Sequence, residues 1–299
     1  MTIVIAGGSG YIGTLLSQKL LSLGNRVVVV DIKAPNITHS ELFFIQCDIT
    51  NNPLPYDVLE KTDAIINLAG RTISTKWNKK TKEEIRLSRI ESTRHIIETI
   101  KNTKNKPSCF VSASAIGFYG DTGDEECDES CDRGTGFLSD VVEDWEKIAE
   151  KATEYGVRTV CVRTAPVLGH GGFLSELTRS ANFGFLLKMK KSDFWMSWIH
   201  EEDIVNTYLF AIETSTLQGV FNACSPEPVR HSSFMKSLGV AMHRKVLGTL
   251  PKFLARRLFG EFFEEITKNQ KVTPKKLIDK GFVFAYPNLA GALNQIFKK

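Results

Sequence analysis

Three glycines near the start of the chain are spaced for binding an anion. They stand in the run GGSGYIG at 7–13, directly after the apolar residues 3–6. Where a strand leads into a glycine-rich turn and then a helix, the glycines let the backbone approach a diphosphate, whose charge the helix N–H groups attract. The pattern predicts a phosphate cradle, with a purely structural turn as its alternative. Its candidate contacts are Gly7, Gly10, Tyr11, Ile12 and Gly13.

Asp31 gives this cradle a specific partner. It ends the second apolar run, roughly 20 residues past the glycine loop, where a carboxylate accepts hydrogen bonds from the ribose of an adenine dinucleotide and repels a 2′-phosphate. Asp31 therefore favours NAD over NADP. Lys33 can reach a phosphate, which keeps NADP as an alternative, and a plain polar strand end is the bland alternative.

Two further strand ends carry candidate cofactor contacts. Asp48 and Ile49 follow the third apolar run and offer a carboxylate for the adenine amino group and an aliphatic face for its ring. The fourth run ends in small residues that let the chain pass close beneath a cofactor, at the sheet edge where ligands bind in such folds. The candidates there are Leu68, Ala69 and Gly70, followed by Arg71 and Lys76 as contacts for a phosphate or an acidic substrate.

The fifth apolar run ends in two serines, Ser112 and Ser114, which precede Tyr119. A serine hydroxyl at the carboxyl edge of a strand can hold a substrate carbonyl or hydroxyl beside a nicotinamide. The alternative is that the hydroxyl satisfies loop backbone. We take Ser114 as the candidate substrate-orienting residue and Tyr119 as the candidate proton carrier.

A parallel sheet is needed to bring these residues together. Apolar runs predict strands at 2–6, 27–31, 43–46, 64–67, 108–113 and 157–163, with helices at 11–23, 81–101 and 137–155. Continuous apolar strands indicate burial on both faces of the sheet. The alternating order predicts an α/β fold, a Rossmann-type doubly wound parallel sheet.

The regular alternation of strand and helix patterns ends after Gly169. Residues 173–196 show no clear alternation; short strands at 198–200 and 220–222 flank a helix at 203–213, and 251–266 reads as one amphipathic helix. The mixed charge of that helix favours core packing over membrane-surface attachment. We divide the chain into a dinucleotide-binding domain, 1–169, to which 199–224 returns, and a smaller, mostly helical C-terminal substrate lobe, 170–299.

Composition limits the function classes. A formal net charge of +4 in 299 residues, with Lys and Arg spread along the chain, gives no nucleic-acid footprint. No apolar run approaches the roughly 20 residues of a membrane span, and no basic leader precedes the first strand, so we expect a cytoplasmic protein. Cys109 and Cys161 read as buried apolar residues, and Cys127 and Cys131 as part of a solvated acidic loop rather than a metal site or redox pair.

A set of segments follows one order: GGSGYIG (7–13), INLAG (66–70), IRLSR (85–89), SASAIGFYG (112–120), FLSDVVEDWE (137–146), VRTAPVLG (162–169), MSWIHEED (196–203), FNACSPEPVR (221–230) and GEFFEEITKNQKVTPKKL (260–277). As a set they resemble the extended and atypical short-chain dehydrogenase/reductase superfamily. More narrowly, they resemble its NAD-dependent, sugar-nucleotide-epimerase-like family with a C-terminal domain of unknown function. The resemblance runs nearly end to end.

The resemblance implies an NAD(P)-binding Rossmann domain and a smaller lobe that closes over the substrate. It adds Val167 as a cofactor contact and Trp77 and Arg230 as substrate contacts. Arg230 stands where extended members hold sugar-nucleotide phosphates, with a surface salt bridge as the alternative. Trp77 belongs either to a pocket wall or to the lobe interface, and we expect His200 to be structural.

The chain departs from the family where proton transfer is usual. Active dehydrogenases of this superfamily use Tyr-x-x-x-Lys, in which the lysine lowers the tyrosine pKa so that a phenolate acts as the base. No tyrosine here is followed by a lysine four positions later. Alignment to the family pattern places Phe137 and Val141 at these positions, so Glu143 or Asp144 would have to substitute if Tyr119 does not.

Two other departures concern the ligands. Relatives that prefer NADP carry Ser-Arg or a similar basic pair where this chain has Asp31-Ile32, which strengthens the NAD interpretation. The glycine-rich stretch expected before the WIH motif is absent from 181–194, which weakens any substrate contact assigned to it.

The sequence supports two main hypotheses. The first is an NAD(P)-binding epimerase or oxidoreductase that acts on a hydroxyl or carbonyl of a small substrate of the nucleotide-sugar type. The second is a catalytically silent NAD(P)-binding sensor or partner-binding protein. A minor third hypothesis takes the basic segment 181–191 and the 251–266 helix as a membrane-surface site. No metal ion or nucleic acid is expected, and the oligomeric state is left open.

Overall fold

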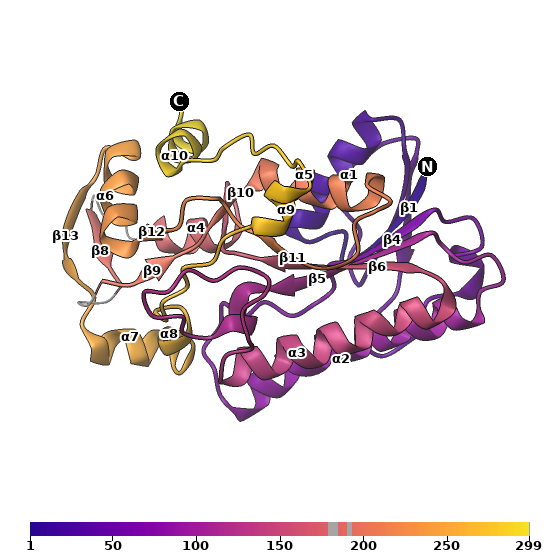
Figure 1. Ribbon diagram of the computed structural model, residues 1–299, viewed down its shortest axis with the longest axis horizontal. Coiled ribbons are helices and arrows are strands. Elements are labelled where there is room, and N and C mark those ends of the chain that lie inside the picture. Colours follow the sequence, from indigo (N-terminus) through magenta and orange to yellow (C-terminus); the bar gives the residue numbers. More distant parts are fainter. Residues whose placement is uncertain (179–184, 190–192, 299) are drawn as a thin grey trace.

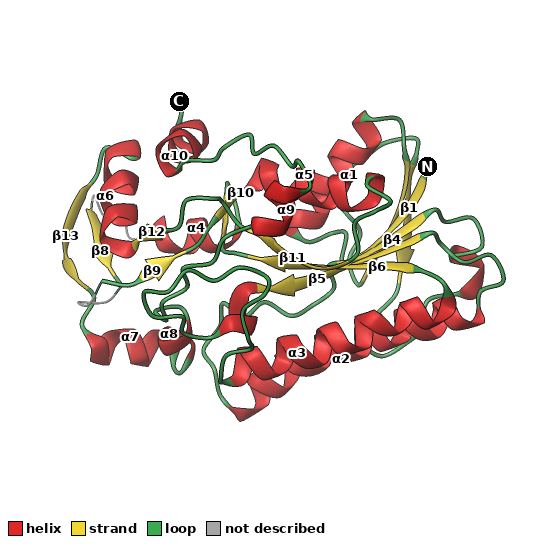
Figure 2. Ribbon diagram, in the orientation of Figure 1, coloured by secondary structure: helices red, strands yellow, loops and turns green. Residues whose placement is uncertain are grey.

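We describe a computed structural model that covers residues 1–178, 185–189 and 193–298. Residues 181–184 and 190–191, which belong to the basic segment considered above, lie outside the described residues, as does part of the departing 181–194 stretch. Figure 2 shows a sheet with helices on both faces, beside a second group of short strands and helices.

A parallel sheet of seven strands organises the described part of the chain (Figure 1). Every neighbouring pair in it is parallel. The chain order reverses between β1 and β4, and in open α/β sheets ligands bind at the carboxyl ends of the strands beside such a reversal. In spatial order the strands are β11 (Gly219–Ala223), β6 (Arg158–Thr164), β5 (Cys109–Ala115), β4 (Ala64–Asn67), β1 (Thr2–Ala6), β2 (Arg26–Asp31) and β3 (Leu42–Gln46).

Helices cover both faces of this sheet. α1 (Tyr11–Ser22) and α5 (Glu201–Glu213) lie on one side, and α2 (Lys79–Asn102) and α3 (Phe137–Glu150) on the other (Figure 1). Alternate residues of β1 feed the two cores: Ile5 packs with the first helix pair and Val4 with the second. Each fully buried aliphatic side chain contributes about 1.5–3 kcal/mol to folding. Short 3-10 turns are η1 (Tyr56–Val58), η2 (Ile116–Tyr119) and η3 (Lys151–Tyr155).

The second half of the chain adds short strands and helices beyond the sheet. The strands are β7 (Val167–Leu168), β8 (Phe185–Lys188), β9 (Trp195–Met196), β10 (Ile199–His200), β12 (Val229–Arg230) and β13 (Lys245–Thr249). The helices are α4 (Gly172–Leu177), α6 (His231–Ala241), α7 (Lys252–Phe259), α8 (Phe262–Glu265), α9 (Lys275–Asp279) and α10 (Leu289–Phe297). A separate core, built around the fully buried Trp198 and Phe234, holds α6 and α10 together.

The C-terminal segment does not stay within this lobe. Leu277 of α9 and Phe282 pack into the core formed by the sheet with α1 and α5. The fully buried carboxylate of Asp203 then accepts hydrogen bonds from the backbone N–H groups of Ala285, at 2.7 Å, and Tyr286, at 3.0 Å. Residues on both sides of position 169 therefore share one core, and we keep the division at that position as a proposal.

The strands and helices predicted for the first half coincide with observed elements to within two residues at most ends. The prediction of one helix over 251–266 is wrong. Gly260 breaks it into α7 and α8, because its backbone has φ +61°, a conformation that other residues rarely adopt. The predicted helix at 137–155 ends earlier as an α-helix and continues as η3.

Candidate functional site

The glycine loop makes close contacts within the chain. Gly7 has φ +76°, and a Cβ atom there would lie 2.6 Å from the backbone nitrogen of Ala69. A Cβ on Gly13 would lie 2.6 Å from Cα of Gly8 and 2.7 Å from the carbonyl oxygen of Gly7. These positions accept only glycine, so the loop is folded tightly against the turn that follows β4.

The N-terminus of α1 is open for an anion. Its N-cap, Gly10, has no side chain to cap the helix, and the first turn of this helix contains no acidic residue. The first backbone N–H groups of a helix need a partner, and their dipoles favour a negative charge. The loop and the helix end together therefore fit the diphosphate of a dinucleotide.

Asp31 is tied to this loop. Its carboxylate accepts hydrogen bonds from the backbone N–H of Ser9, at 3.0 Å, and of Ile32, at 2.7 Å. The Ser9 hydroxyl in turn donates to the carbonyl oxygen of Lys33. The half-buried carboxylate thus lies at the end of β2 beside the cradle, where the ribose of a dinucleotide would be recognised.

The two adenine contacts predicted after the third strand differ in exposure: Asp48 is exposed and Ile49 is buried. Asp48 is exposed and its carboxylate accepts hydrogen bonds within its own loop, from Thr50 N–H and the Asn51 side chain. Ile49 is only 5% exposed and belongs to the core under α2, where its carbonyl oxygen lies 2.8 Å from Nδ1 of His95. The structure thus leaves Ile49 little surface for a ring.

The turn after β4 is held from below. Asn67 is fully buried; its side chain donates to Thr93 at 2.9 Å and accepts from the Ala69 N–H at 3.1 Å. Arg71, a predicted phosphate contact, forms an ion pair with the carboxylate of Glu84. The shape of the LAG turn is therefore fixed by side chains that the sequence analysis did not single out.

Ser114 begins a buried polar network at the carboxyl end of β5. Its hydroxyl donates to a carboxylate oxygen of Glu146 on α3. Arg163 of β6 grips the same carboxylate with two hydrogen bonds of 2.8 and 2.7 Å, in the bidentate geometry that strengthens such pairs. The ring of Phe118 lies 3.4 Å from the Arg163 guanidinium carbon. Glu146 and Arg163 were missed because one lies on α3 and the other on β6, and only the packing of the helix against the sheet brings them together.

Tyr119 lies deeper in the same network. It is 3% exposed; its hydroxyl donates to Oδ1 of Asn222 at 2.8 Å and accepts from Arg163 at 2.9 Å. Burial raises the pKa of Tyr119 to about 12, although Arg163 opposes this shift. A tyrosine with this pKa stays protonated at neutral pH, and its proton is already bound. The geometry therefore gives Tyr119 an anchoring position rather than that of a proton carrier.

Apolar packing occupies the positions that the family pattern assigns to Tyr and Lys. Phe137 packs edge-on against Trp77, with ring centroids 5.1 Å apart, and Val141 is 1% exposed. Trp77 is itself 4% exposed and lies close to Phe262 of α8, which supports its assignment to the lobe interface. The two carboxylates named as substitutes are paired: Glu143 with Arg133 and Lys147, and Asp144 with Arg86.

Tyr11 links the cradle to the second half of the chain. Its hydroxyl donates to Glu201, whose carboxylate also accepts from the His170 N–H at 3.0 Å. A Cβ on Gly171 would lie 2.6 Å from the Tyr11 ring. Val167, a predicted cofactor contact, is half-buried in β7 against the core of the sheet.

Two predicted residues of the lobe have partners within the chain. Arg230 forms an ion pair with Asp124 and lies over the ring of Trp195, 4.3 Å from its centroid, so a phosphate would have to displace or join Asp124. His200 is 1% exposed, accepts from the Glu202 N–H through Nδ1 and contacts Gln295 through Nε2. Burial lowers its pKa, and the expected structural role of His200 is confirmed.

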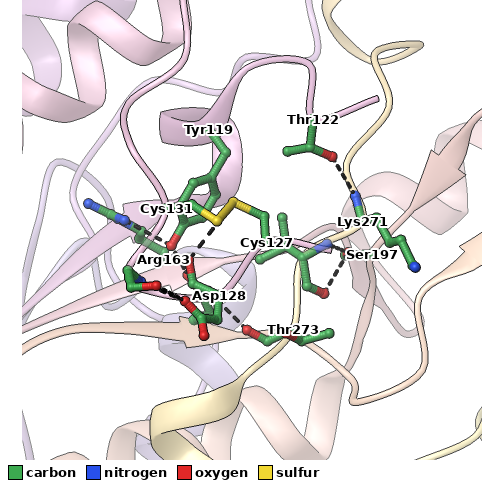
Figure 3. The surroundings of a disulfide bond; sticks show 12 residues. Tyr119, Thr122, Cys127, Asp128, Cys131, Arg163, Ser197, Lys271 and Thr273 are labelled. Atoms are coloured by element: carbon green, nitrogen blue, oxygen red, sulfur yellow. Dashed lines mark hydrogen bonds between the residues drawn. A yellow bond between two sulfur atoms is a disulfide. The ribbon is translucent and has the colours of Figure 1, made fainter. Parts of the chain in front are cut away.

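The reading of Cys127 and Cys131 as a solvated loop is wrong. The two residues form a disulfide bond (Figure 3), and Cys127 is 5% exposed. Cys127 also pairs with the C-terminal segment, donating its N–H to Lys271 and accepting from Thr273. Sequence spacing alone did not show this burial, because the covering residues 271–273 come from the other half of the chain.

The disulfide ring encloses Glu129, which joins three parts of the fold. One carboxylate oxygen of Glu129 accepts from the Asn222 N–H at 2.9 Å, and the other accepts from the Lys276 N–H at 3.1 Å. Asn222 is the residue that binds the Tyr119 hydroxyl. The ring therefore stands one contact away from the Ser114 network.

Across residues 1–178, 185–189 and 193–298, no three His, Cys, Asp or Glu side chains are grouped so as to hold a metal ion. Within the same described ranges, no helix combines the length and the apolar character needed to span a membrane.

Known proteins resemble this chain over its whole length. The epimerase family protein YfhF of Bacillus subtilis is 32% identical over 99% of this chain and 98% of its own. A chloroplastic homologue of the epimerase family protein SDR39U1 from Arabidopsis thaliana is 30% identical over 100% of this chain and 87% of its own.

Solved structures agree with these sequence relatives. The human epimerase family protein SDR39U1, crystallised with NADPH, superposes with a TM-score of 0.88 over 100% of both chains at 26% identity. A nucleoside-diphosphate sugar epimerase from Corynebacterium glutamicum gives 0.79 at 28% identity, over 99% of this chain and 58% of that one. The expected Rossmann-type fold is thereby confirmed.

Family models cover most of the sequence. The model described as the NAD dependent epimerase/dehydratase family matches residues 3–224, and a domain of unknown function, DUF1731, matches 250–296. The match confirms the resemblance found in the sequence and the NAD(P) class of cofactor that it implies. This chain belongs to the NAD dependent epimerase/dehydratase family.

Proposed function

We propose that this chain is an NAD-binding epimerase or oxidoreductase of the atypical short-chain type. The glycine cradle carries the proposal, because its close contacts at Gly7 and Gly13 and the uncapped start of α1 fit a diphosphate. We propose the glycine loop, Tyr11, Ile12, Asp31, the Leu68–Gly70 turn and Val167 as the cofactor contacts, and the cytoplasm as the location.

The choice of NAD over NADP rests on Asp31. Its carboxylate lies beside the cradle and would repel a 2′-phosphate, whereas the human relative was crystallised with NADPH. Mass spectrometry of the small molecules released on denaturing the purified protein identifies the bound dinucleotide. Asp31→Ser should shift the ratio of NADP to NAD affinity upward by about tenfold or more, through loss of like-charge repulsion. A wild-type preference for NADP would refute the assignment.

The reaction class follows from the fold family and from Ser114. A bound nicotinamide supplies hydride exchange with a carbon that bears a hydroxyl or carbonyl group. The Ser114 hydroxyl donates a hydrogen bond to Glu146, so its oxygen can still accept a hydrogen bond from a substrate hydroxyl. We assign proton transfer at that hydroxyl to the Ser114–Glu146 pair and an anchoring role to Tyr119.

We propose a nucleotide sugar as the substrate class, with Arg230 as the phosphate contact and Trp77 as a residue that shapes the closure of the lobe. The similar Corynebacterium protein carries the name of such an epimerase. Incubation of the purified protein with NAD or NADH and a panel of UDP- and dTDP-sugars and simple carbonyls tests this. Absence of turnover with every substrate, despite cofactor binding, would exclude catalysis within the panel.

A catalytically silent dinucleotide sensor is the second candidate. The observation that favours it is the apolar packing of Phe137 and Val141 where the family pattern has Tyr and Lys. In a sensor, the cofactor must change the affinity for a partner, and Gly13→Asp must abolish that change. Identical partner recovery with and without cofactor would exclude the sensor.

A further inference from the structure

Arg89, in the middle of α2, is a positive charge without a carboxylate. Its guanidinium donates through Nη1 to two backbone carbonyl oxygens, those of Arg71 and Ile85, both at 3.0 Å. Among residues 1–178, 185–189 and 193–298, it has no ion-pair partner, and its Nε and Nη2 groups have no hydrogen-bond acceptor. Three of its five N–H donors are therefore available.

Other arginines are fully partnered, either by a carboxylate or, as in Arg158, by three backbone carbonyl oxygens. On the same helix, Arg86 pairs with Asp144 and Arg94 pairs with Glu91. Across the sheet, the buried Arg163 has its bidentate partner Glu146. In Arg89, by contrast, the half-buried guanidinium leaves three N–H groups to water or to an anionic ligand.

The guanidinium is half-buried and firmly placed. It lies over the ring of Trp145, 5.4 Å from its centroid, and burial lowers the pKa of Arg89 to about 10, which leaves it charged at neutral pH. The indole N–H of Trp145 donates to Thr93 at 2.8 Å, and Thr93 donates to the Arg89 carbonyl oxygen at 2.8 Å. The side chain therefore rests on a fixed support.

Its position connects it with the cradle. A Cβ added to Gly70 would lie 3.4 Å from Cγ and Cζ of Arg89. Gly70 follows Ala69, whose backbone nitrogen would lie 2.6 Å from a Cβ on Gly7. One short turn thus has the glycine loop against its first residues and the Arg89 guanidinium against its last, at the sheet edge where ligands of this fold bind.

From this placement we propose that Arg89 binds a phosphate group of the ligand seated over the Leu68–Gly70 turn. The inference rests on the proposed function, and it adds a side-chain cation to a cradle otherwise made of backbone N–H groups. A guanidinium suits this task because its planar fork can bind two phosphate oxygens at once. The phosphate belongs either to the dinucleotide or to a nucleotide-sugar substrate.

Calorimetric titration of purified full-length protein with NAD, UDP and inorganic pyrophosphate tests the proposal. Arg89→Gln should weaken at least one of these ligands tenfold or more, and the ligand that is weakened identifies the source of the phosphate. Arg89→Lys keeps the charge without the fork and should give a smaller loss. Adenosine, which has no phosphate, should bind Arg89→Gln and wild type equally.

Arg94→Gln is the matched control, because Arg94 lies on the same helix in an exposed pair with Glu91. It should bind all four ligands as the wild type does. Thermal unfolding checks that each variant is folded, and Arg89→Lys serves if Arg89→Gln does not fold. Arg89 variants that bind NAD, UDP and pyrophosphate within twofold of wild type would overturn the inference. A wild-type protein that binds no dinucleotide refutes the proposed function instead, and the UDP and pyrophosphate titrations still test Arg89.

Discussion

A single methyl group decides whether the glycine loop can close. At Gly13 it would lie 2.6 Å from Cα of Gly8, so Gly13→Ala must push the loop away from the start of α1. We expect dinucleotide affinity to fall at least tenfold, measured by titration of intrinsic fluorescence or by calorimetry. Ser22→Ala, an exposed change at the far end of the same helix, should have no effect. Unchanged affinity in Gly13→Ala would show that the ligand does not use this loop.

The Ser114 network separates two roles that the sequence could not distinguish. Glu146→Gln should lower kcat by about 10²–10⁴-fold with little change in KM, since removing a proton acceptor affects the transition state. Tyr119→Phe should cost less, because that hydroxyl is bound to Asn222 and Arg163. Kinetics on any substrate found in the panel compare the two. The reverse ranking would return the proton transfer to Tyr119.

Local patterns predicted the strand, loop and helix that carry the glycines and the strand end that carries Asp31. Gly13 meets Gly8 within the same short loop and Asp31 ends the next strand, so the spacing along the chain marks both positions. Glu146 on α3 and Arg163 on β6 form an ion pair. Arg89 stands out because, among the described residues, no carboxylate pairs with its guanidinium. A single sequence does not contain such long-range pairings.

At the scale of elements, the start of α6 introduces a pH dependence. His231 is 1% exposed, stacks on Phe194 with ring centroids 4.6 Å apart, and has no partner for Nε2 in the described part of the chain. Burial lowers its pKa to about 4, with Lys188 adding to the shift and Asp193 opposing it. In the unfolded chain the ring titrates near 6.5.

Between these two pKa values the unfolded state binds the proton and the folded state does not. Stability should therefore fall as the pH drops from about 6.5 towards 4, by about 3 kcal/mol from this group. His231→Phe should flatten that part of the profile of unfolding free energy against pH, measured by urea denaturation. His243→Asn, an exposed control, should keep the wild-type slope. Equal slopes in wild type and His231→Phe would contradict the assignment.

Elements were predictable where one period of hydrophobicity dominates. β1 and β2 are apolar on both faces, so their positions followed directly from the sequence. The break between α7 and α8 was not predicted, because the stripe of apolar residues continues across Gly260 while the backbone does not. The pairing of β8 with β13 joins short strands far apart in the chain, which no local period marks.

On the scale of the whole molecule, the Cys127–Cys131 disulfide makes a countable prediction. Protein denatured without reductant should react with iodoacetamide at the four remaining cysteines, and at all six after reduction. Such bonds are uncommon in the cytoplasm, so the count also tests the proposed location. Reduction should lower the unfolding free energy by roughly 2 kcal/mol, since the bond closes a short loop. Cys47→Ser should not change that difference, and six labels without reductant would show that the bond is absent.

Bridges tie residues 250–296 to the first half of the chain, Trp77 pairing with Gly260 and Cys127 with Val272. The two family models are separated by residues 225–249, whereas both bridges join the segment of the second model to that of the first. These two bridges constrain recombination between relatives. A chimera that takes its last 50 or so residues from a distant homologue inherits only one side of each bridge. Exchanging the 121–131 loop together with the tail restores both sides of the Cys127–Val272 bridge, so we expect these two segments to evolve as one unit.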